Sequence, residues 1–113
     1  MSGSPSNGVD DVLKVLADSR RRHALCCLQR HGELSLPDLA EEVTVREDDA
    51  PLPEVSAERV SEVYFSLYHT HVPKLEEVGF VRYNQQRDLV TGLERIDPAV
   101  RDVQGELDAI LDT

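Results

Sequence analysis

The chain has 113 residues and an excess of acidic side chains, with 22 Asp and Glu against 12 Lys and Arg and a formal net charge of −10. This length suits one domain and is too short for two sizeable cores. No apolar run approaches the roughly 18–20 residues of a membrane span, and the adjacent Cys26 and Cys27 do not make a disulfide framework. We therefore expect a cytoplasmic single-domain protein with no membrane partner.

The acidic residues are dispersed along the chain rather than gathered in one block. Lysine occurs only at Lys14 and Lys74, whereas arginine occurs ten times. This composition is typical of proteins from salt-accumulating halophiles, because high net charge preserves solubility and strong screening removes most of the self-repulsion. The alternative interpretation is an acidic nucleic-acid mimic or an anti-repressor.

The first third of the chain predicts a flexible tail over residues 1–8 and then two helices. Asp18 or Ser19 can cap the second helix, which we place over residues 19–31, and Gly32 ends it. Apolar residues recur at helical spacing in both helices. They are Val9, Val12, Leu13 and Leu16 in the first helix and Ala24, Leu25 and Leu28 in the second.

The next segment predicts a short extended piece over residues 33–35, followed by a helix over residues 38–43. Pro37 suits the first turn of that helix, where its missing N–H costs no hydrogen bond. Two prolines and several carboxylates follow, so we expect a loop over residues 44–54.

A long helix is predicted over residues 57–78, capped by Ser56 and ended by Gly79. Pro73 lies inside it, where a proline removes one backbone hydrogen bond and crowds the carbonyl four residues earlier. The helix therefore either kinks at Pro73 or consists of two helices that meet near His71. The expected core positions are Val60, Val63, Leu67, Leu75 and Val78, with Tyr64, Tyr68 and His71 at the boundary.

Residues 80–92 predict a β-hairpin, because FVRY and DLVTG are short strand-like runs separated by NQQR. Residues 97–113 predict a C-terminal helix that opens at Pro98 and carries an apolar stripe. The stripe consists of Val100, Val103, Leu107, Ile110 and Leu111. The expected organisation is a mainly α domain with a small hairpin over residues 9–96, followed by this helix.

Two segments resemble ArsR-type transcriptional regulators. HVPKLEEVGFV, residues 71–81, is similar to the HLxxLxxAGLV signature at the end of their recognition helix, and residues 17–43 resemble their opening segment. More narrowly, the combination resembles the small winged-helix domains common in haloarchaea. The resemblance covers about residues 12–93 and implies a winged helix-turn-helix fold with an additional C-terminal helix.

The chain also departs from that family. The family usually has a three- or four-residue turn between its second and third helices, whereas residues 44–55 intervene here, and the third helix starts about two turns early. The cysteine pair, CxC, of its metal sensors is absent. These departures bear on the angle at which the helix enters a groove of DNA.

Residues 63–87 form a neutral window in the acidic chain, because Glu76 and Glu77 are their only carboxylates. Hydroxyls and imidazoles can contact base edges, and an ammonium group can neutralise a phosphate. The candidate contacts on the predicted recognition helix, about residues 56–78, are Ser66, His69, Thr70 and Lys74. The alternative is an ordinary solvent-exposed polar face.

The expected wing, about residues 80–92, carries Asn84, Gln85, Gln86 and Arg87 at its tip. These side chains suit the DNA backbone or the minor groove, although asparagine also favours turns for local reasons. For the basic triplet at residues 20–22 we favour a structural role, through pairing with the many carboxylates of the chain.

No other chemistry is predicted: we expect no enzyme, no cofactor and no metal. His69 and His71 are two residues apart and so point to different faces of a helix. His23 and His31 are expected at the surface or near helix ends. At least one of Cys26 and Cys27 is expected in the core, while a redox-sensing thiol would need a basic neighbourhood.

The sequence therefore favours a transcriptional regulator of a halophilic archaeon that binds double-stranded DNA. The C-terminal helix, residues 97–113, is predicted to pair with a second copy, since a homodimer presents two recognition helices to a two-fold site; packing within one chain is the alternative. A winged-helix module that binds proteins and not DNA is the second functional hypothesis. A ligand- or redox-responsive sensor using Cys26 and Cys27 is the third.

Overall fold

A computed structural model describes residues 8–96 of the chain, with the side chains of residues 11–96. The predicted tail and the predicted C-terminal helix over residues 97–113 lie outside the described residues, and so does the dimerisation role of that helix. Among the described helices, none is both long enough and apolar enough to cross a membrane.

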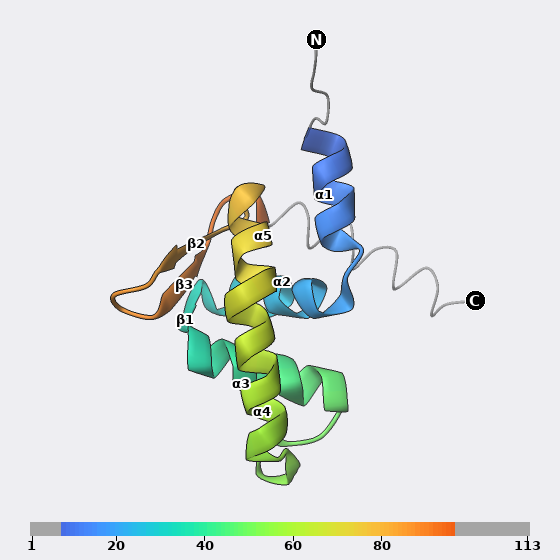
Figure 1. The fold of residues 1–113 in the computed structure, drawn as a ribbon, viewed down its shortest axis with the longest axis vertical. Coiled ribbons are helices and arrows are strands. Elements are labelled where there is room, and N and C mark those ends of the chain that lie inside the picture. Colours follow the sequence, from blue (N-terminus) through green and yellow to red (C-terminus); the bar gives the residue numbers. More distant parts are fainter. Residues whose placement is uncertain (1–7, 97–113) are drawn as a thin grey trace, which may run out of the picture.

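The described residues are mainly helical, with one small antiparallel sheet (Figure 1). The helices are α1 (Gly8–Leu16), α2 (Ser19–His31), α3 (Leu36–Asp48), α4 (Ala57–Ser66) and α5 (Val72–Glu77). A 3₁₀ turn, η1 (Leu52–Glu54), precedes α4, and a π-helical turn, η2 (Leu67–His71), joins α4 to α5. The strands are β1 (Glu33–Ser35), β2 (Val81–Asn84) and β3 (Leu89–Gly92).

The predicted ends of α2 are confirmed. Asp18 is the N-cap, and its Oδ1 accepts hydrogen bonds from the backbone N–H groups of Arg20 at 2.8 Å and Arg21 at 3.2 Å. Gly32 ends the helix with a φ of 82°, a conformation that side chains with a Cβ rarely adopt. These caps satisfy backbone groups that the helix itself leaves unpaired.

The predicted loop over residues 44–54 is wrong in its first half, because α3 continues to Asp48. Thr44 is fully buried, and its hydroxyl donates to the carbonyl of Ala40 at 2.6 Å. The helix ends at Asp49, which adopts a left-handed conformation with a φ of 51°. The connection between α3 and α4 is therefore shorter than predicted, and η1 gives part of it regular structure.

The predicted long helix forms as one continuous run, α4–η2–α5, with Ser56 as its N-cap (Figure 1). The π turn lies directly before Pro73, and within it the backbone N–H of Val72 donates to the carbonyl of Leu67, five residues earlier. A π turn widens the helix where the proline ring would otherwise meet a carbonyl. The run accommodates Pro73 in this way and does not divide into two separate helices. We refer to α4–η2–α5 as the long helix.

The core lies between α2, α3, the long helix and the inner face of the sheet. Of the core positions predicted on the long helix, Val63, Leu67 and Leu75 are buried, whereas Val60 and Val78 are half-buried. Other buried residues include Leu25, Leu28, Leu36, Leu39, Val43, Phe80 and Val90. This core orients the opposite side of the long helix toward solvent.

The hairpin is confirmed, and the predicted extended piece completes a sheet with the order β1–β3–β2. Val90 of β3 lies opposite Leu34 of β1 on one side and opposite Tyr83 of β2 on the other. The hairpin projects to one side of the long helix (Figure 1). The hairpin thus lies beside the exposed side of the long helix (Figure 1).

Candidate nucleic-acid interface

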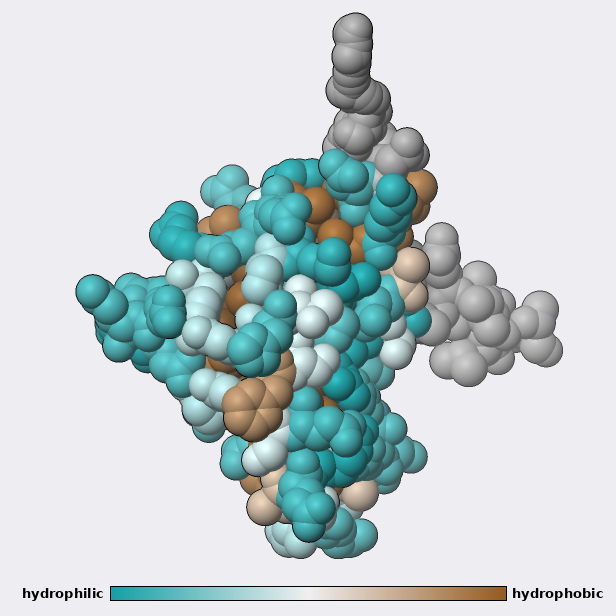
Figure 2. Space-filling view, viewed as in Figure 1, coloured by the Kyte–Doolittle hydropathy of each residue, from teal (hydrophilic) through white to brown (hydrophobic). Residues whose placement is uncertain are grey.

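The outer face of the long helix, which we define as Phe65, Ser66, His69, Thr70 and Lys74, contains the predicted helix contacts and one residue that the sequence analysis missed. His69, Thr70 and Lys74 are exposed, and Ser66 is half-buried. Between Val63 and Leu75 this part of the chain has no carboxylate. In Figure 2 the front of the long helix is a pale strip with brown side chains, bordered by teal surface.

Phe65 is the missed residue, and 58% of its surface is exposed. It lies opposite the buried Val63 and Leu67, at the point of the helix farthest from the core. His69 lies one turn later on the same side, and its ring stacks on that of Phe65 at a centroid distance of 6.2 Å. The centre of the outer face is therefore Phe65 and His69.

The remaining predicted helix contacts lie on the flank of the long helix away from the hairpin. At 3.6 residues per turn, Ser66 and Thr70 lie on one side of Phe65 and Tyr68 on the other. Lys74 lines a groove of about 210 Å³ together with Lys14 of α1 and the carboxylates Asp11 and Glu77. The only two lysines of the chain thus lie beside the same groove.

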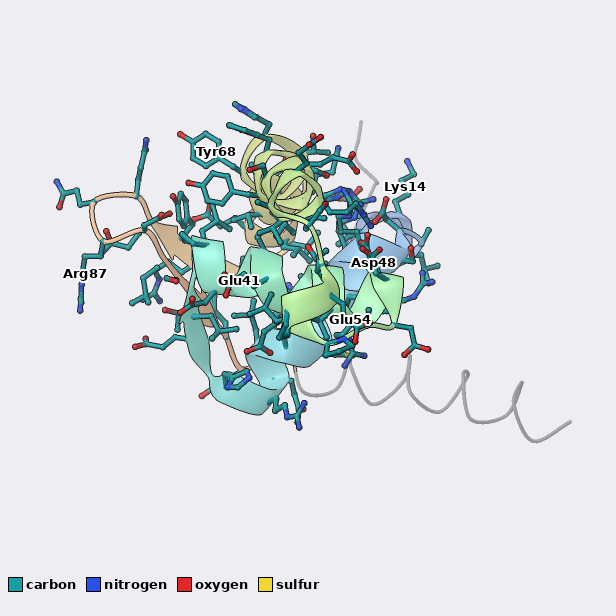
Figure 3. The ribbon with its side chains drawn as sticks, turned by 90° about the horizontal axis from the view of Figure 1, so that it is seen from below. Lys14, Glu41, Asp48, Glu54, Tyr68 and Arg87 are labelled. Atoms are coloured by element: carbon teal, nitrogen blue, oxygen red, sulfur yellow. The ribbon has the colours of Figure 1, made fainter. Side chains whose placement is uncertain are left out.

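Aromatic side chains fill the other flank, between the long helix and the hairpin. Tyr68 stacks on Tyr64 at 6.4 Å and meets the edge of Tyr83 of β2 at 6.1 Å. Tyr68 and Lys14 lie on opposite sides of the long helix (Figure 3). The chain has only three Tyr and two Phe, and every one except Phe80 lies on this flank or on the outer face beside it.

Three hydrogen bonds stabilise the hairpin and its position against the long helix. Gln85 Nε2 donates to Tyr68 Oη at 3.2 Å, and the backbone N–H of Tyr83 donates to Glu76 Oε2 at 3.2 Å. The Tyr83 hydroxyl donates to Asp88 Oδ1 at 2.6 Å. Burial and this bond to Asp88 raise the pKa of Tyr83, so its hydroxyl stays protonated at neutral pH.

The predicted wing-tip residues Asn84, Gln85, Gln86 and Arg87 are all exposed. Their roles differ, however. Asn84 Oδ1 accepts the backbone N–H of Arg87 at 3.1 Å, so this side chain shapes the turn, and Gln85 contacts Tyr68. Arg87 projects from the tip and points away from Tyr68 (Figure 3). The four residues therefore do not form one continuous surface with the outer face.

Within the basic triplet, Arg20 makes the expected pairing with a carboxylate, whereas Arg21 and Arg22 do not. Arg20 makes two bonds to Glu47 of α3, at 2.6 Å and 2.8 Å, and Glu47 also accepts from Arg59 of α4 at 2.9 Å. The hydrogen bond from Arg20 lowers the pKa of Glu47. Arg21 and Arg22 donate to backbone carbonyls at the end of α1.

The two histidines of the HxH pair point in different directions, as predicted, because His69 is exposed and His71 is buried. Arg21 Nη1 lies 3.3 Å from His71 Nδ1, and Asp18 Oδ1 lies 4.0 Å from the same nitrogen. Since a guanidinium can only donate, His71 Nδ1 accepts and the ring is neutral. Burial lowers the pKa of His71 in agreement with that assignment.

Cys27 is buried and Cys26 is half-buried, so the expectation of at least one core cysteine is confirmed. Burial raises the pKa of Cys27 to about 11, whereas a redox-sensing thiol needs a depressed pKa. Cys27 also lines a pocket of about 350 Å³ with Arg30, Arg46 and several carboxylates. Within residues 8–96 no three His, Cys, Asp or Glu side chains gather as a metal site would require.

The fold and this surface define a small, mainly helical domain with a three-stranded antiparallel sheet and a fixed hairpin beside an exposed helix face. Residues 13–91 match the model of a family described as domain of unknown function DUF7344, and the chain belongs to that family. The match includes the whole outer face and the hairpin tip. No curated protein and no solved structure matches the chain.

Proposed function

We propose that the chain is a winged helix-turn-helix protein that binds double-stranded DNA as a transcriptional regulator. In this assignment α2, α3 and the long helix are the three helices of the motif, β2–β3 is the wing, and α1 is an addition. The source would be a halophilic archaeon, the location cytoplasmic, and the active form a homodimer paired through residues 97–113.

One observation carries the proposal: the outer face, free of carboxylates, has the groove with both lysines, Asp11 and Glu77 on one flank and the hairpin on the other. A helix in a major groove needs hydrogen-bonding groups at its centre and cations where the phosphate strands pass on each side. Ser66, His69 and Thr70 would contact base edges. Lys74 and Lys14 would meet one phosphate strand, and Arg87 at the wing tip the backbone or the minor groove.

The net charge of −10 is compatible with DNA binding under molar salt. Phosphate contacts contribute little affinity there, because counterion release weakens as salt rises. Recognition would then depend on direct base contacts and shape. The outer face suits that mode because it is neutral rather than strongly basic.

The test is selection of genomic fragments by the full chain at molar potassium. We expect discrete sites to be enriched, and the double variant His69→Ala with Thr70→Ala to bind them about tenfold more weakly or worse. The matched control is Gln29→Ala with His31→Ala, two exposed residues at the end of α2. If no fragment is enriched, or if both double variants bind alike, the assignment is wrong.

The second candidate function is a protein-interaction module with the same fold. The exposed Phe65 and the surrounding tyrosines favour it, because aromatic residues are enriched at protein interfaces. Failure of fragment selection together with recovery of a defined protein partner at the same face would establish this second function in place of the first.

A further inference from the structure

We propose that Phe65 contacts the 5-methyl group of a thymine in the bound DNA, and so makes the outer face specific for a T·A base pair. This inference rests on the proposed function and adds a base preference to it. It starts from the exposed aromatic ring that lies at the centre of a face otherwise made of hydrogen-bonding side chains.

The ring lies beside two aromatic neighbours on the long helix. It stacks on His69 with an interplanar angle of 13°, and the edge of Tyr64 meets it at 5.7 Å and 86°. Both contacts come from the same helix and leave the outer side of the ring open, with 58% of the residue exposed. An exposed ring with aromatic neighbours suits a small apolar partner that approaches along the helix face.

Phe65 is the large exposed apolar side chain of this face, because the neighbouring Tyr64 and Tyr68 are half-buried and carry hydroxyl groups. The other large exposed apolar residues among the described side chains, Leu13 and Leu52, belong to α1 and η1. Protein interfaces usually need a wider apolar centre. The Phe65 ring, bordered by the polar side chains of Ser66 and His69, instead has the size to contact one methyl group that is surrounded by the polar groups of base edges.

Base chemistry identifies that methyl group. In the major groove thymine is the base that presents a methyl group beside its hydrogen-bonding group. An aromatic side chain at the centre of a recognition helix would bury unpaired polar edges opposite any other base. Opposite thymine it buries apolar surface on both partners.

Charge near Phe65 also permits close approach to DNA. No carboxylate lies between Val63 and Leu75. Glu62, one position upstream, accepts a hydrogen bond from Arg59 at 2.9 Å, which offsets its charge. The imidazole of His69, stacked on Phe65, can bond the neighbouring purine edge.

The experiment begins with selection of random duplexes by the full chain at molar potassium. Each thymine of the selected sequence is then replaced by uracil, which removes the methyl group and keeps the base pairing. In each half-site we expect one thymine at which this replacement raises the dissociation constant of the wild-type protein about fourfold. A fourfold change corresponds to the loss of one buried methyl group. Phe65→Ala should bind the thymine and uracil duplexes equally.

Leu52→Ala is the matched control, because it removes another exposed apolar side chain, 43% exposed and far along the chain from Phe65. It should keep the wild-type difference between thymine and uracil. Circular dichroism checks that the Phe65→Ala variant is folded, which we expect for a surface position. The two variants together assign the methyl effect to one side chain.

The outcomes separate this inference from the proposed function. Selection of a defined sequence with no thymine sensitive to uracil overturns the contact and leaves DNA binding in place. A thymine effect that survives in Phe65→Ala also overturns the contact, since the methyl group then acts through DNA shape. Selection that yields no sequence overturns the proposed function and this inference with it.

Discussion

Glu47 joins three helices through two arginines. From α3 it accepts hydrogen bonds from Arg20 of α2 and Arg59 of α4, and only 14% of its side chain is exposed. Arg59 also bonds Asp48 at 2.8 Å. These contacts hold the last turns of α3 and the start of the long helix together, and so help to fix the outer face.

We predict that Glu47→Gln lowers the free energy of unfolding by about 2 kcal/mol, between the small value of a surface pair and the larger value of a buried one. The change leaves two partly buried guanidinium groups without their shared carboxylate. Glu62→Gln is the control, because it also removes a bond to Arg59 but its side chain is 66% exposed. Urea denaturation should show a loss below about 0.5 kcal/mol for Glu62→Gln; equal losses would contradict the role of burial.

The stability of the fold depends on pH through His71. Burial lowers its pKa, so the folded chain keeps the ring neutral while the unfolded chain takes up a proton below about pH 6.5. Stability from this group is therefore full above that value and is lost as the pH falls toward the folded-state pKa. His23, whose pKa is also lowered by burial, acts in the same direction.

We predict that His71→Gln loses less stability than the wild type between pH 7.5 and pH 5.5, a window around the ordinary histidine pKa of about 6.5. Glutamine keeps an acceptor for Arg21 and does not titrate. Denaturation midpoints across that range measure the effect, and His23 is present in both proteins, so their difference isolates His71. Parallel midpoint curves would show that Asp18, 4.0 Å away, already supports the protonated ring.

At this scale the sequence predicted which polar side chains of the long helix are exposed, but not the contacts around them. His69, Thr70 and Lys74 are exposed as expected, because helical periodicity separates them from the core. Phe65 was missed, since an apolar residue between Tyr64 and Ser66 resembles a core position until burial is known. The pairing of Glu47 with Arg20, 27 residues away, depends on tertiary packing that no local pattern contains.

At the scale of elements, the long helix shows how a proline can be accommodated without a break. The N-cap and the ending glycine were predictable from single residues, and both are confirmed. The π turn was not, because its extra residue is fixed by buried side chains on both sides, Leu67 and Val72. Likewise α3 continues beyond its predicted end, because the burial of Thr44 outweighs the loop-like composition of the residues that follow it.

We predict that Pro73→Ala changes the free energy of unfolding by less than about 1 kcal/mol, whereas an unrelieved proline inside a helix costs about 3 kcal/mol. The reason is that the π turn before Pro73 already removes the clash. Pro37→Ala is the control, because Pro37 is also exposed and lies in the first turn of α3, where proline is tolerated. Chemical denaturation of the two variants should give similar small changes; a gain near 3 kcal/mol for Pro73→Ala alone would mean that strain persists.

At the scale of the whole molecule, the net negative charge has opposite effects on solubility and on the stability of the fold. A net charge of −10 favours solubility, but the like charges repel one another in the folded state, most strongly when little salt is present. The outer face avoids this acidity, and the ion pairs around Glu47 offset it locally. The remaining exposed carboxylates include Glu54, Glu58 and Glu77.

We predict that raising potassium chloride from about 0.1 M to about 1 M raises the melting temperature by roughly 5 °C, which corresponds to about 1 kcal/mol in the free energy of unfolding. The reason is that the added salt shortens the screening length from about 10 Å to about 3 Å. The triple variant Glu54→Gln, Glu58→Gln and Glu77→Gln lowers the net charge from −10 to −7, since three carboxylates are removed. It should melt higher than the wild type at low salt and gain less from added salt, as followed by circular dichroism. Because the three side chains are exposed and lie apart along the chain, the effect of the triple variant reflects net charge and not one lost contact. An equal salt gain in both proteins would instead assign the stabilisation to stronger burial of apolar surface in salt, and the acidity would then serve solubility alone.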